Sequence, residues 1–291
     1  MGRPRILSGV SVPAPPLRVA VVGHLEWIDF AVVDRIPRAG EIAHATDAWQ
    51  EPGGGGGVAA VQLARLAGGC DLFTAVGDDA VGRRMVAELE GLGVRVHAAL
   101  RDAPTRRAVS LLDGRGERTI VTLGARLEAH GADALPWETL AQVDAVYVTA
   151  GDPEALAAAR TARLFVATPR ALGEVIAAGT PPDALVGSAL DVAEAVDPNA
   201  LPWRVPLVVR TAGATGGSFT MADGGGGTYD AVAPPGPVVD SYGAGDAFAA
   251  GLTFALARGD AYEGALAFAA RCGAAAATGR GSFAGQLRHP G

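Results

Sequence analysis

Lysine is absent from this chain of 291 residues, so all 24 of its strongly basic side chains are arginines. Without lysine the chain has no lysine of a Walker-type phosphate loop, no Schiff base and no anchor for pyridoxal phosphate. Asparagine occurs only once, at Asn199. Any phosphate that this protein handles must therefore be held by backbone N–H groups, by arginine or by a metal ion.

Other features that the sequence lacks narrow the class of protein. The net charge is −7, so there is no basic footprint for a nucleic acid. No apolar run approaches the roughly 18 residues of a membrane span, and prolines at positions 13, 15 and 16 interrupt the N-terminal apolar stretch, unlike in a signal peptide. Cys70 and Cys272 lie far apart without metal-ligand spacing, as expected of buried thiols in a reducing compartment. We expect a cytoplasmic protein without nucleic-acid or membrane partners.

Short apolar strands alternate with helical segments through the second half of the chain. Residues 18–24 (RVAVVGH) are a β-branched run typical of a first buried strand. The later strands are expected at 143–150, 164–168, 183–188 and 206–213, with helices at 153–162 and 171–179 between them. Strands separated by helices of this length predict βαβ units and an α/β fold, a doubly wound, mostly parallel sheet flanked by helices.

Two strand-rich segments, at 28–50 and 106–122, do not fit this alternation. The second contains an Asp-Gly pair between two apolar runs, which is a strong hairpin signal. We expect the two segments to pair into a small β-strand lid over one edge of a single domain at 18–282. Residues 1–17 are expected to form a loose leader and residues 283–291 a loose tail.

The stretch VVDSYGAGDAFAAGLTFALARG (238–259) places a glycine turn and an aspartate at the beginning of a helical segment. Gly243 and Gly245 let the backbone approach a ligand closely, and the first N–H groups of the helix favour an anion. Asp246 falls in the first turn, where the helix dipole favours its ionised form. The aspartate is either a helix-terminal charge or a base beside an anion site, and this turn alone leaves both interpretations open.

Five segments together resemble the ribokinase-like (PfkB) family of carbohydrate kinases. They are GAGD (243–246), GGGGGVAAVQLARLAG (53–68), TAVGDDAVGRRMVAELEGLGV (74–94), PRAGEI (37–42) and RTAGATGG (210–217). Their order and spacing extend the resemblance over roughly residues 18 to 282. This resemblance favours the interpretation of Asp246 as a base beside an anion site over that of a helix-terminal charge.

The resemblance implies transfer of the γ-phosphate of ATP, with Mg²⁺, to a hydroxyl of a sugar or sugar-like small molecule. Asp246 is expected to be the general base, and the backbone of Gly243, Ala244 and Gly245 the anion hole. Asp240 matches a position that binds a monovalent cation such as K⁺ in several members of the family. Alternatively, and with equal weight, Asp240 is a turn residue at the end of a strand. The glycine-rich segments imply nucleotide contacts at Thr211, Gly213, Gly216 and Gly273.

The chain departs from the family where a sugar would bind. Ribokinases carry Lys and Asn in their early glycine signature, after a glycine that is Gly54 here, and those two places fall on Gly55 and Val58. Near the first strand, Glu26 takes the place of a sugar-binding Asn and Ile28 that of an Asp. Glu26 is the best remaining group for a sugar, and Asp152 is a second candidate. Hydrogen-bonded specificity is lost when its donors are lost, so plain ribose is not expected to be the best substrate.

The metal-ordering Asn-x-x-Glu motif of the family is also altered. Its nearest match, VGSALDVAE, keeps the spacing with Ser188 and Asp191, followed by Glu194, and these carboxylates would reach Mg²⁺ through water. A helix cap formed by Ser188 and Asp191 is the alternative. The lid segments contain three arginines, Arg106, Arg107 and Arg118. Either one of them reaches a phosphate or an acidic group of the substrate, or all three are surface charges.

Three other functions are weighed against the sugar kinase. A nucleoside kinase of the same fold would use the same turn, and a non-catalytic sugar- or nucleotide-binding relative is favoured by the missing Lys and Asn but not by the intact GAGD. A Rossmann oxidoreductase predicts G-x-G-x-x-G after the first strand, where this chain has GHLEWI instead. Because an exposed lid edge is a liability unless it pairs, we expect a homodimer formed through the lid.

Overall fold

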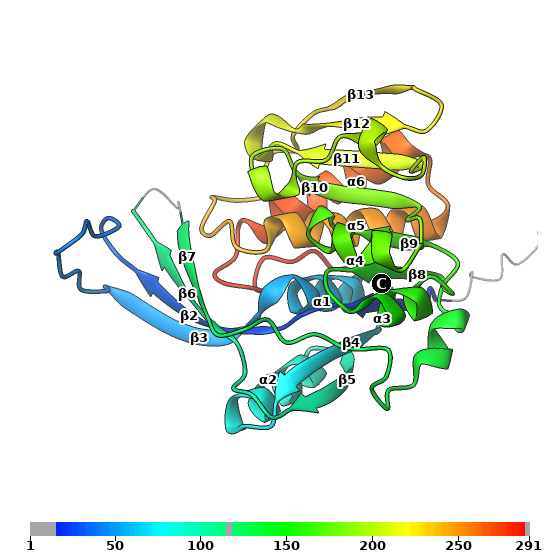
Figure 1. Ribbon diagram of the computed structural model, residues 1–291. Coiled ribbons are helices and arrows are strands. Elements are labelled where there is room, and N and C mark those ends of the chain that lie inside the picture. The colour runs from blue at the N-terminus through cyan, green and yellow to red at the C-terminus, as the bar shows by residue number, and fades with distance from the viewer. Residues whose placement is uncertain (1–15, 115–117, 289–291) are drawn as a thin grey trace, which may run out of the picture.

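A nine-stranded sheet forms the centre of the protein in the computed structural model, which describes residues 16–114 and 118–288 (Figure 1). Its strand order is β13-β12-β11-β10-β9-β8-β1-β4-β5. The strands are β1 (Val19–Val22), β4 (Cys70–Gly77), β5 (Val94–Arg101), β8 (Ala145–Val148), β9 (Phe165–Ala167), β10 (Ala184–Ser188), β11 (Leu207–Thr211), β12 (Gly217–Met221) and β13 (Gly226–Tyr229). Strands β5 to β11 in this order run parallel, while β12 and β13 add an antiparallel edge.

Helices cover both faces of this sheet, as the alternation of buried side chains along β1 requires. Val19 and Val21 face one apolar core with residues of α1, α2, α5 and α6, whereas Ala20 and Val22 face a second core with residues of α3 and α4. The helices are α1 (Gly54–Ala67), α2 (Ala80–Gly91), α3 (Pro153–Ala159), α4 (Leu172–Ala177), α5 (Ala244–Arg258) and α6 (Tyr262–Ala276). Short 3₁₀ turns are η1 (Trp137–Gln142), η2 (Pro169–Ala171), η3 (Val192–Glu194), η4 (Pro198–Ala200) and η5 (Gly213–Thr215). The predicted doubly wound α/β fold is confirmed.

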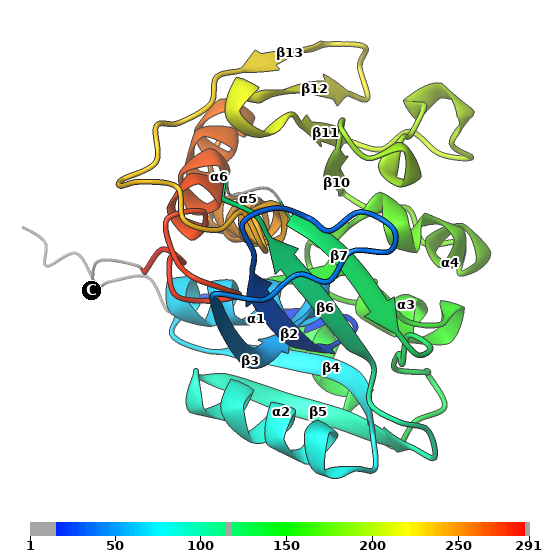
Figure 2. The same cartoon turned by 90° about the vertical axis from the view of Figure 1, so that its left-hand side faces the viewer.

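A four-stranded mixed sheet forms the lid, in the order β3-β2-β6-β7. Its strands are β2 (Glu26–Val32), β3 (Asp47–Gly53), β6 (Arg107–Leu112) and β7 (Arg118–Leu123). The two hairpins β2–β3 and β6–β7 join through the parallel pair β2–β6, so the two segments predicted to form a lid do pair with each other. Figures 1 and 2 show this sheet projecting from the core beside the ends of α1 and α5.

Four elements differ from the sequence-based expectation, and one expected segment falls almost wholly outside the described residues. The apolar pattern of the sequence predicts a helix over 58–68, but helix α1 begins earlier, at Gly54 within the glycine run, because its first turn packs directly on the chain that leaves β1. Strands β5, β12 and β13 were not predicted, since β12 and β13 contain glycine and few apolar residues, and the apolar residues of β5 are mixed with arginine and histidine. The predicted leader (1–17) lies almost wholly outside the described residues.

The segment that follows α6 is packed rather than loose up to residue 288. Gln286 is buried and donates from its amide to the carbonyl oxygen of Val58 at 2.8 Å, and Gln62 of α1 donates to the carbonyl oxygen of Leu287 at 2.8 Å. Arg65 of α1 donates to the carbonyl oxygen of Phe283. The expectation of a loose tail from 283 onward therefore does not describe these residues, which cover the outer side of α1. Among the described helices, none is both long and apolar enough to cross a membrane.

Candidate active site at the opening of α5

The GAGD segment forms the turn into α5. Gly243 has φ +73°, a left-handed conformation that glycine adopts without strain, and it precedes the first helical residue, Ala244. A Cβ on Gly243 would lie 2.7 Å from Cγ1 of Val58, so this turn packs tightly against α1. The N–H groups of Gly245 and Asp246 have no hydrogen-bond partner among the described residues, whereas that of Ala244 donates to the carbonyl oxygen of Ser241 at 3.3 Å. The opening of α5 thus offers free donors beside Asp246.

The carboxylate of Asp246 faces the beginning of α1. A Cβ on Gly55 would lie 3.0 Å from Asp246 Oδ1, 3.5 Å from His24 Cε1 and 3.5 Å from Thr149 Cγ2. Glycine at position 55 therefore leaves room for three side chains that come from α5, from the end of β1 and from the end of β8. Asp246 accepts no hydrogen bond from any described residue, and α5 has no side-chain cap, so this aspartate does not cap the helix by hydrogen bonding.

Burial and, to a lesser extent, the nearby carboxylates of Glu194 and Glu26 raise the pKa of Asp246 from 3.8 to about 6, although the guanidinium groups of Arg118 and Arg170 lower it. A carboxyl group with a pKa near 6 is ionised at neutral pH and takes up a proton readily. General bases work best with a pKa near the operating pH. The electrostatics therefore suit proton abstraction.

One flank of Asp246 carries an ion-pair network around Arg170. Arg170 Nε donates to Glu194 Oε1 at 2.6 Å, and its Nη2 donates to Asp191. The second carboxylate oxygen of Glu194 accepts from the N–H of Ser188 at 2.6 Å, and Asp191 also accepts from the N–H of Ala193 at 2.9 Å. Both carboxylates are thus occupied by protein donors, an arrangement that does not fit direct binding of a metal ion. Within the described ranges, no group of three or more His, Cys, Asp or Glu side chains could hold a metal.

The other flank of Asp246 lies under the lid. Glu26 at the first position of β2 is buried, and its Oε1 lies 2.9 Å from Arg106 Nε and 4.0 Å from His24 Nε2. Burial raises the pKa of Glu26, and the positive charge of Arg106 opposes this. The pKa of His24 is lowered to about 3, mainly by burial and to a smaller extent by the positive charges of Arg126, Arg106 and Arg170. Its imidazole is therefore neutral at physiological pH.

The remaining sugar-site candidates lie in different surroundings. Ile28 and Val58 have side chains with no solvent exposure and pack in the core shared by the lid and α1. Asp152 caps α3, where its Oδ1 accepts from Ala155 N and Gly131 N, both at 2.8 Å. No described contact joins Asp152 to Asp246. Gly54, with φ +80°, opens α1 and donates its N–H to Tyr242 Oη at 3.0 Å.

The residues predicted to contact the nucleotide or a cation are spread over three places. Thr211, Gly213 and Gly216 lie at the end of β11 and in η5, next to Ser188 in the register of β10 and β11. Gly273 lies in α6, where a Cβ would come within 3.0 Å of the carbonyl oxygen of Ala244. Asp240 is buried, and its two carboxylate oxygens accept from Tyr242 N at 2.9 Å and from Gly281 N at 3.1 Å, as a residue that organises a turn does.

Sequence reasoning missed three residues of this cluster, Thr149, Arg170 and Tyr242, and for His24 it favoured a polar loop role over a place in the substrate cleft. His24 and Thr149 follow β1 and β8, two neighbouring strands of the sheet. Residues directly after such strands lie at the edge where ligands bind, so this was an available signal. Arg170 and Tyr242 carry no such signal in the sequence.

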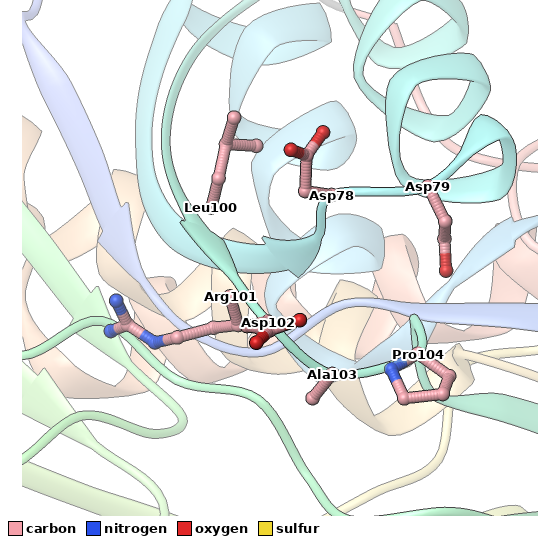
Figure 3. Close-up of a pocket in the computed structure, with 7 residues that line it drawn as sticks. All are labelled: Asp78, Asp79, Leu100, Arg101, Asp102, Ala103 and Pro104. Atoms are coloured by element: carbon pink, nitrogen blue, oxygen red, sulfur yellow. The ribbon is translucent and has the colours of Figure 1, made fainter.

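A surface hollow elsewhere on the molecule is lined by residues at the end of β5 and by residues that follow β4 and β5 (Figure 3). Three of its four charged side chains are engaged with the protein: Arg101 pairs with Asp133 at 2.7 Å, Asp78 pairs with Arg83 at 2.8 Å, and Asp79 accepts from Gly82 N at 2.7 Å as the cap of α2. None of the lining residues is near Asp246 in any described contact. This hollow is therefore not the candidate active site.

Comparison with known proteins agrees with this geometry. Residues 17–172 and 182–287 match the pfkB family carbohydrate kinase. The chain belongs to the pfkB family of carbohydrate kinases. Family membership, which the GAGD and glycine segments predicted, is thereby confirmed, and so is the assignment as an enzyme of the kinase class.

Two curated pfkB relatives are similar to the chain. The ATP-dependent ribose-1-phosphate kinase of Halopiger xanaduensis is 29% identical over 278 residues, which cover 89% of this chain and 91% of that protein. The ribokinase of Dictyostelium discoideum is 30% identical over 108 residues, which cover 36% of this chain and only 34% of that protein. The crystal structure of a ribokinase from Thermotoga maritima has a TM-score of 0.76 at 22% identity and covers 94% of this chain and 96% of that one. This likeness shows the fold.

Proposed function

We propose that the protein transfers the γ-phosphate of ATP to a hydroxyl group of a sugar-like acceptor, with Asp246 as general base. The observation that carries the proposal is the position of Asp246 at the opening of α5, beside free N–H groups and with a pKa raised to about 6. The printed name of the Halopiger relative, an ATP-dependent kinase of a sugar phosphate, supports the choice of nucleotide.

The reaction needs little from the protein beyond position and charge. Asp246 would accept the proton of the acceptor hydroxyl as its oxygen forms a bond to the γ-phosphorus, while the bond between that phosphorus and the β–γ bridging oxygen breaks and ADP leaves. The free N–H groups of Gly245 and Asp246, together with that of Gly243, would donate to the negative oxygens of the transferring group. The turn formed by the GAGD segment would thus supply both the base and the anion hole.

The Arg170 network is the candidate for the side on which the nucleotide phosphates bind. Ser188, Asp191 and Glu194 surround Arg170, and Thr211 is next to Ser188 across β10 and β11. Mg²⁺ would enter with the phosphates of ATP, and Asp191 and Glu194 would meet it only through water. Glu194 also holds the pKa of Asp246 up, so this network couples the nucleotide side to the base.

The acceptor is not expected to be plain ribose. Gly55 and Val58 stand where the ribokinase signature has Lys and Asn, and Val58 is fully buried, so neither residue offers a hydrogen bond to a sugar. Glu26 is the carboxylate that remains on the lid side of the site. This loss of donors argues for a different set of polar groups on the acceptor.

A homodimer formed through the lid is part of the proposal. Strand β7 is one of the two outer strands of the lid sheet, and Ile120, Val121 and Leu123 on it are 41%, 52% and 46% exposed. An apolar strand at a sheet edge is an aggregation site unless another strand or chain covers it. Pairing of two β7 edges would cover these side chains without changing the core.

The test is a screen of acceptors with ATP and Mg²⁺, read by mass spectrometry of the phosphorylated product. The panel contains pentoses, hexoses, sugar phosphates, sugar acids and nucleosides. Formation of a phosphorylated sugar or sugar derivative supports the proposal. Phosphorylation of nucleosides alone would favour the nucleoside kinase, and ligand binding without any product would favour a non-catalytic relative.

A further inference from the structure

Four buried polar atoms around the candidate site have no hydrogen-bond partner among the described residues. They are Arg118 Nη1, Arg106 Nε, His24 Nδ1 and Thr149 Oγ1. Arg106 Nε lies 2.9 Å from Glu26 Oε1, but the direction of its N–H does not make a hydrogen bond. Nearly all buried polar groups in folded proteins are hydrogen-bonded, so such a concentration calls for a missing partner. The site is therefore built to be completed by a polar ligand.

Arg118 is held in place without an acidic partner. It is the first residue of β7, and its guanidinium carbon lies 5.2 Å from the centre of the Tyr242 ring. Tyr242 is itself fixed, since its hydroxyl accepts from Gly54 N at 3.0 Å and its ring meets that of Phe30 edge-on at 5.2 Å. Stacking on an aromatic face orients a guanidinium group while leaving its N–H donors free. No described carboxylate lies within ion-pair distance of Arg118.

The arginines on the lid side differ in how closely carboxylates engage them. Arg170 is paired with Glu194 and Asp191, and Arg106 stands beside Glu26. Arg126 lies 3.6 Å from the nearest oxygen of Glu128, which is beyond hydrogen-bond distance. Arg118 and Arg126 are thus two guanidinium groups around the site without a hydrogen-bonded carboxylate among the described residues.

We propose that the acceptor carries an anionic group, a phosphate or a carboxylate, and that Arg118, together with Arg106 and Arg126, binds it under the lid. This inference rests on the proposed function, because it names the class of acceptor for the same site. Arginine binds such planar or tetrahedral anions through paired N–H donors. The anion would lie on the lid side, and the hydroxyl to be phosphorylated would face Asp246.

The name of the Halopiger relative is consistent with this class, since that protein is described as a kinase of ribose-1-phosphate. The arginine positions lie in the lid segments and after β7, whereas Arg170 lies in η2 and is paired with Glu194 and Asp191, although its charge also acts on Glu26 and His24. An anion of the acceptor and the phosphates of ATP would therefore be bound by different arginines. This separation makes the two roles distinguishable by experiment.

The experiment measures acceptor binding by titration calorimetry, without catalysis, so that its outcome does not depend on phosphoryl transfer. The full chain with Asp246→Asn is titrated with ribose, ribose-1-phosphate, ribose-5-phosphate, ribonate and gluconate, and separately with ATP. The same titrations are made with Arg118→Gln and with Arg118→Lys added. The control is Arg107→Gln: Arg107 lies on neighbouring β6 but pairs with Asp29 at 2.6 Å on an exposed part of the lid.

The expected result is binding of at least one phosphate or carboxylate sugar about tenfold or more tighter than ribose. Arg118→Gln should weaken this binding by roughly ten- to a hundredfold, the loss expected for hydrogen bonds to a charged group, with partial recovery in Arg118→Lys and no change in Arg107→Gln. ATP binding should be unchanged by Arg118→Gln. Preference for phosphate or for carboxylate among the five probes identifies which anion the site takes.

Three outcomes would overturn the inference. They are binding of ribose as tight as that of its charged derivatives, binding of the charged sugars that survives Arg118→Gln, and loss of ATP affinity in Arg118→Gln without loss of sugar affinity. Failure of every charged probe to bind has the same meaning. Tight binding of a charged sugar without any phosphorylated product in the wild-type protein would instead contradict the proposed function and leave the anion site standing.

Discussion

Replacing Asp246 by asparagine should stabilise the protein while it removes the proposed base. Burial and Glu194 raise the pKa of Asp246 from 3.8 to about 6, so the native state holds this proton more tightly than the unfolded chain does. At neutral pH the ionised carboxylate therefore costs up to about 3 kcal/mol of folding free energy. Asparagine has nearly the same shape and no charge, so it removes this cost.

The pH dependence has a defined sign. Stability of the wild-type protein relative to the variant falls as the pH rises from 3.8 to about 6, because the native state loses a proton that the unfolded chain has already lost. Above pH 6 the difference is constant. At pH 7.5, Asp246→Asn should raise the free energy of unfolding by up to about 3 kcal/mol, or Tm by about 5 °C for a chain of this size, and the difference should vanish near pH 4.

The assay is urea or thermal unfolding of both proteins between pH 4 and 8, with Asp240→Asn as the matched control. Asp240 lies in the same loop, but its carboxylate accepts two backbone N–H groups, so its replacement should destabilise by about 1–3 kcal/mol. If Asp246 were only a favourable charge at the beginning of α5, its replacement would instead cost about 0.3–1 kcal/mol. A loss of stability in Asp246→Asn at pH 7.5 would refute this reasoning.

Four further outcomes are expected. The rate constant kcat/KM should rise about tenfold per pH unit up to pH 6 and then level off as Asp246 ionises, and a flat profile between pH 5 and 7 would contradict its role as base. Gly55→Ala should lower kcat at least about tenfold without unfolding the protein, since its Cβ would lie 3.0 Å from the carboxylate of Asp246. The control, Gly69→Ala, has open space around it and should leave kcat unchanged; equal kcat in both variants would argue against a crowded site. Tyr242→Phe should cost about 1–3 kcal/mol of stability in urea unfolding, because it strands a buried N–H at the start of α1, and an unchanged midpoint would show that water replaces the hydroxyl. Val121→Lys should shift the mass measured by light scattering from dimer to monomer, and a wild-type monomer would exclude pairing through the lid.

The sequence predicted most of the fold because its apolar runs are short and clearly separated. Strands such as 143–150 and 206–213 and the helix around Asp246 appear where expected, within a few residues. The beginning of α1 was misplaced because propensity argues against four consecutive glycines in a helix. Close packing of that turn on His24 overrides the propensity: a Cβ on Gly56 would lie 2.7 Å from the carbonyl oxygen of His24.

The position of Asp246 and its glycine turn at the opening of α5 could be predicted, but the electrostatic surroundings of Asp246 could not. Asp246 and its glycine turn are contiguous in the chain, so a local pattern suffices to find them. The groups that set its pKa, among them Glu194, Arg118 and Arg170, come from separate elements that only the fold brings together. The lid arginines could be named from the sequence as a set, yet only their partners distinguish surface Arg107 from Arg118.

The most direct test of the central claim is a single-turnover measurement of acceptor phosphorylation by the wild-type protein and by Asp246→Asn, with ATP and Mg²⁺ and an acceptor from the screen. If Asp246 is the base, the variant should bind ATP and acceptor as before and transfer phosphate about 10²- to 10⁴-fold more slowly. Transfer at the wild-type rate would contradict the account and leave Asp246 as a charge at the beginning of α5.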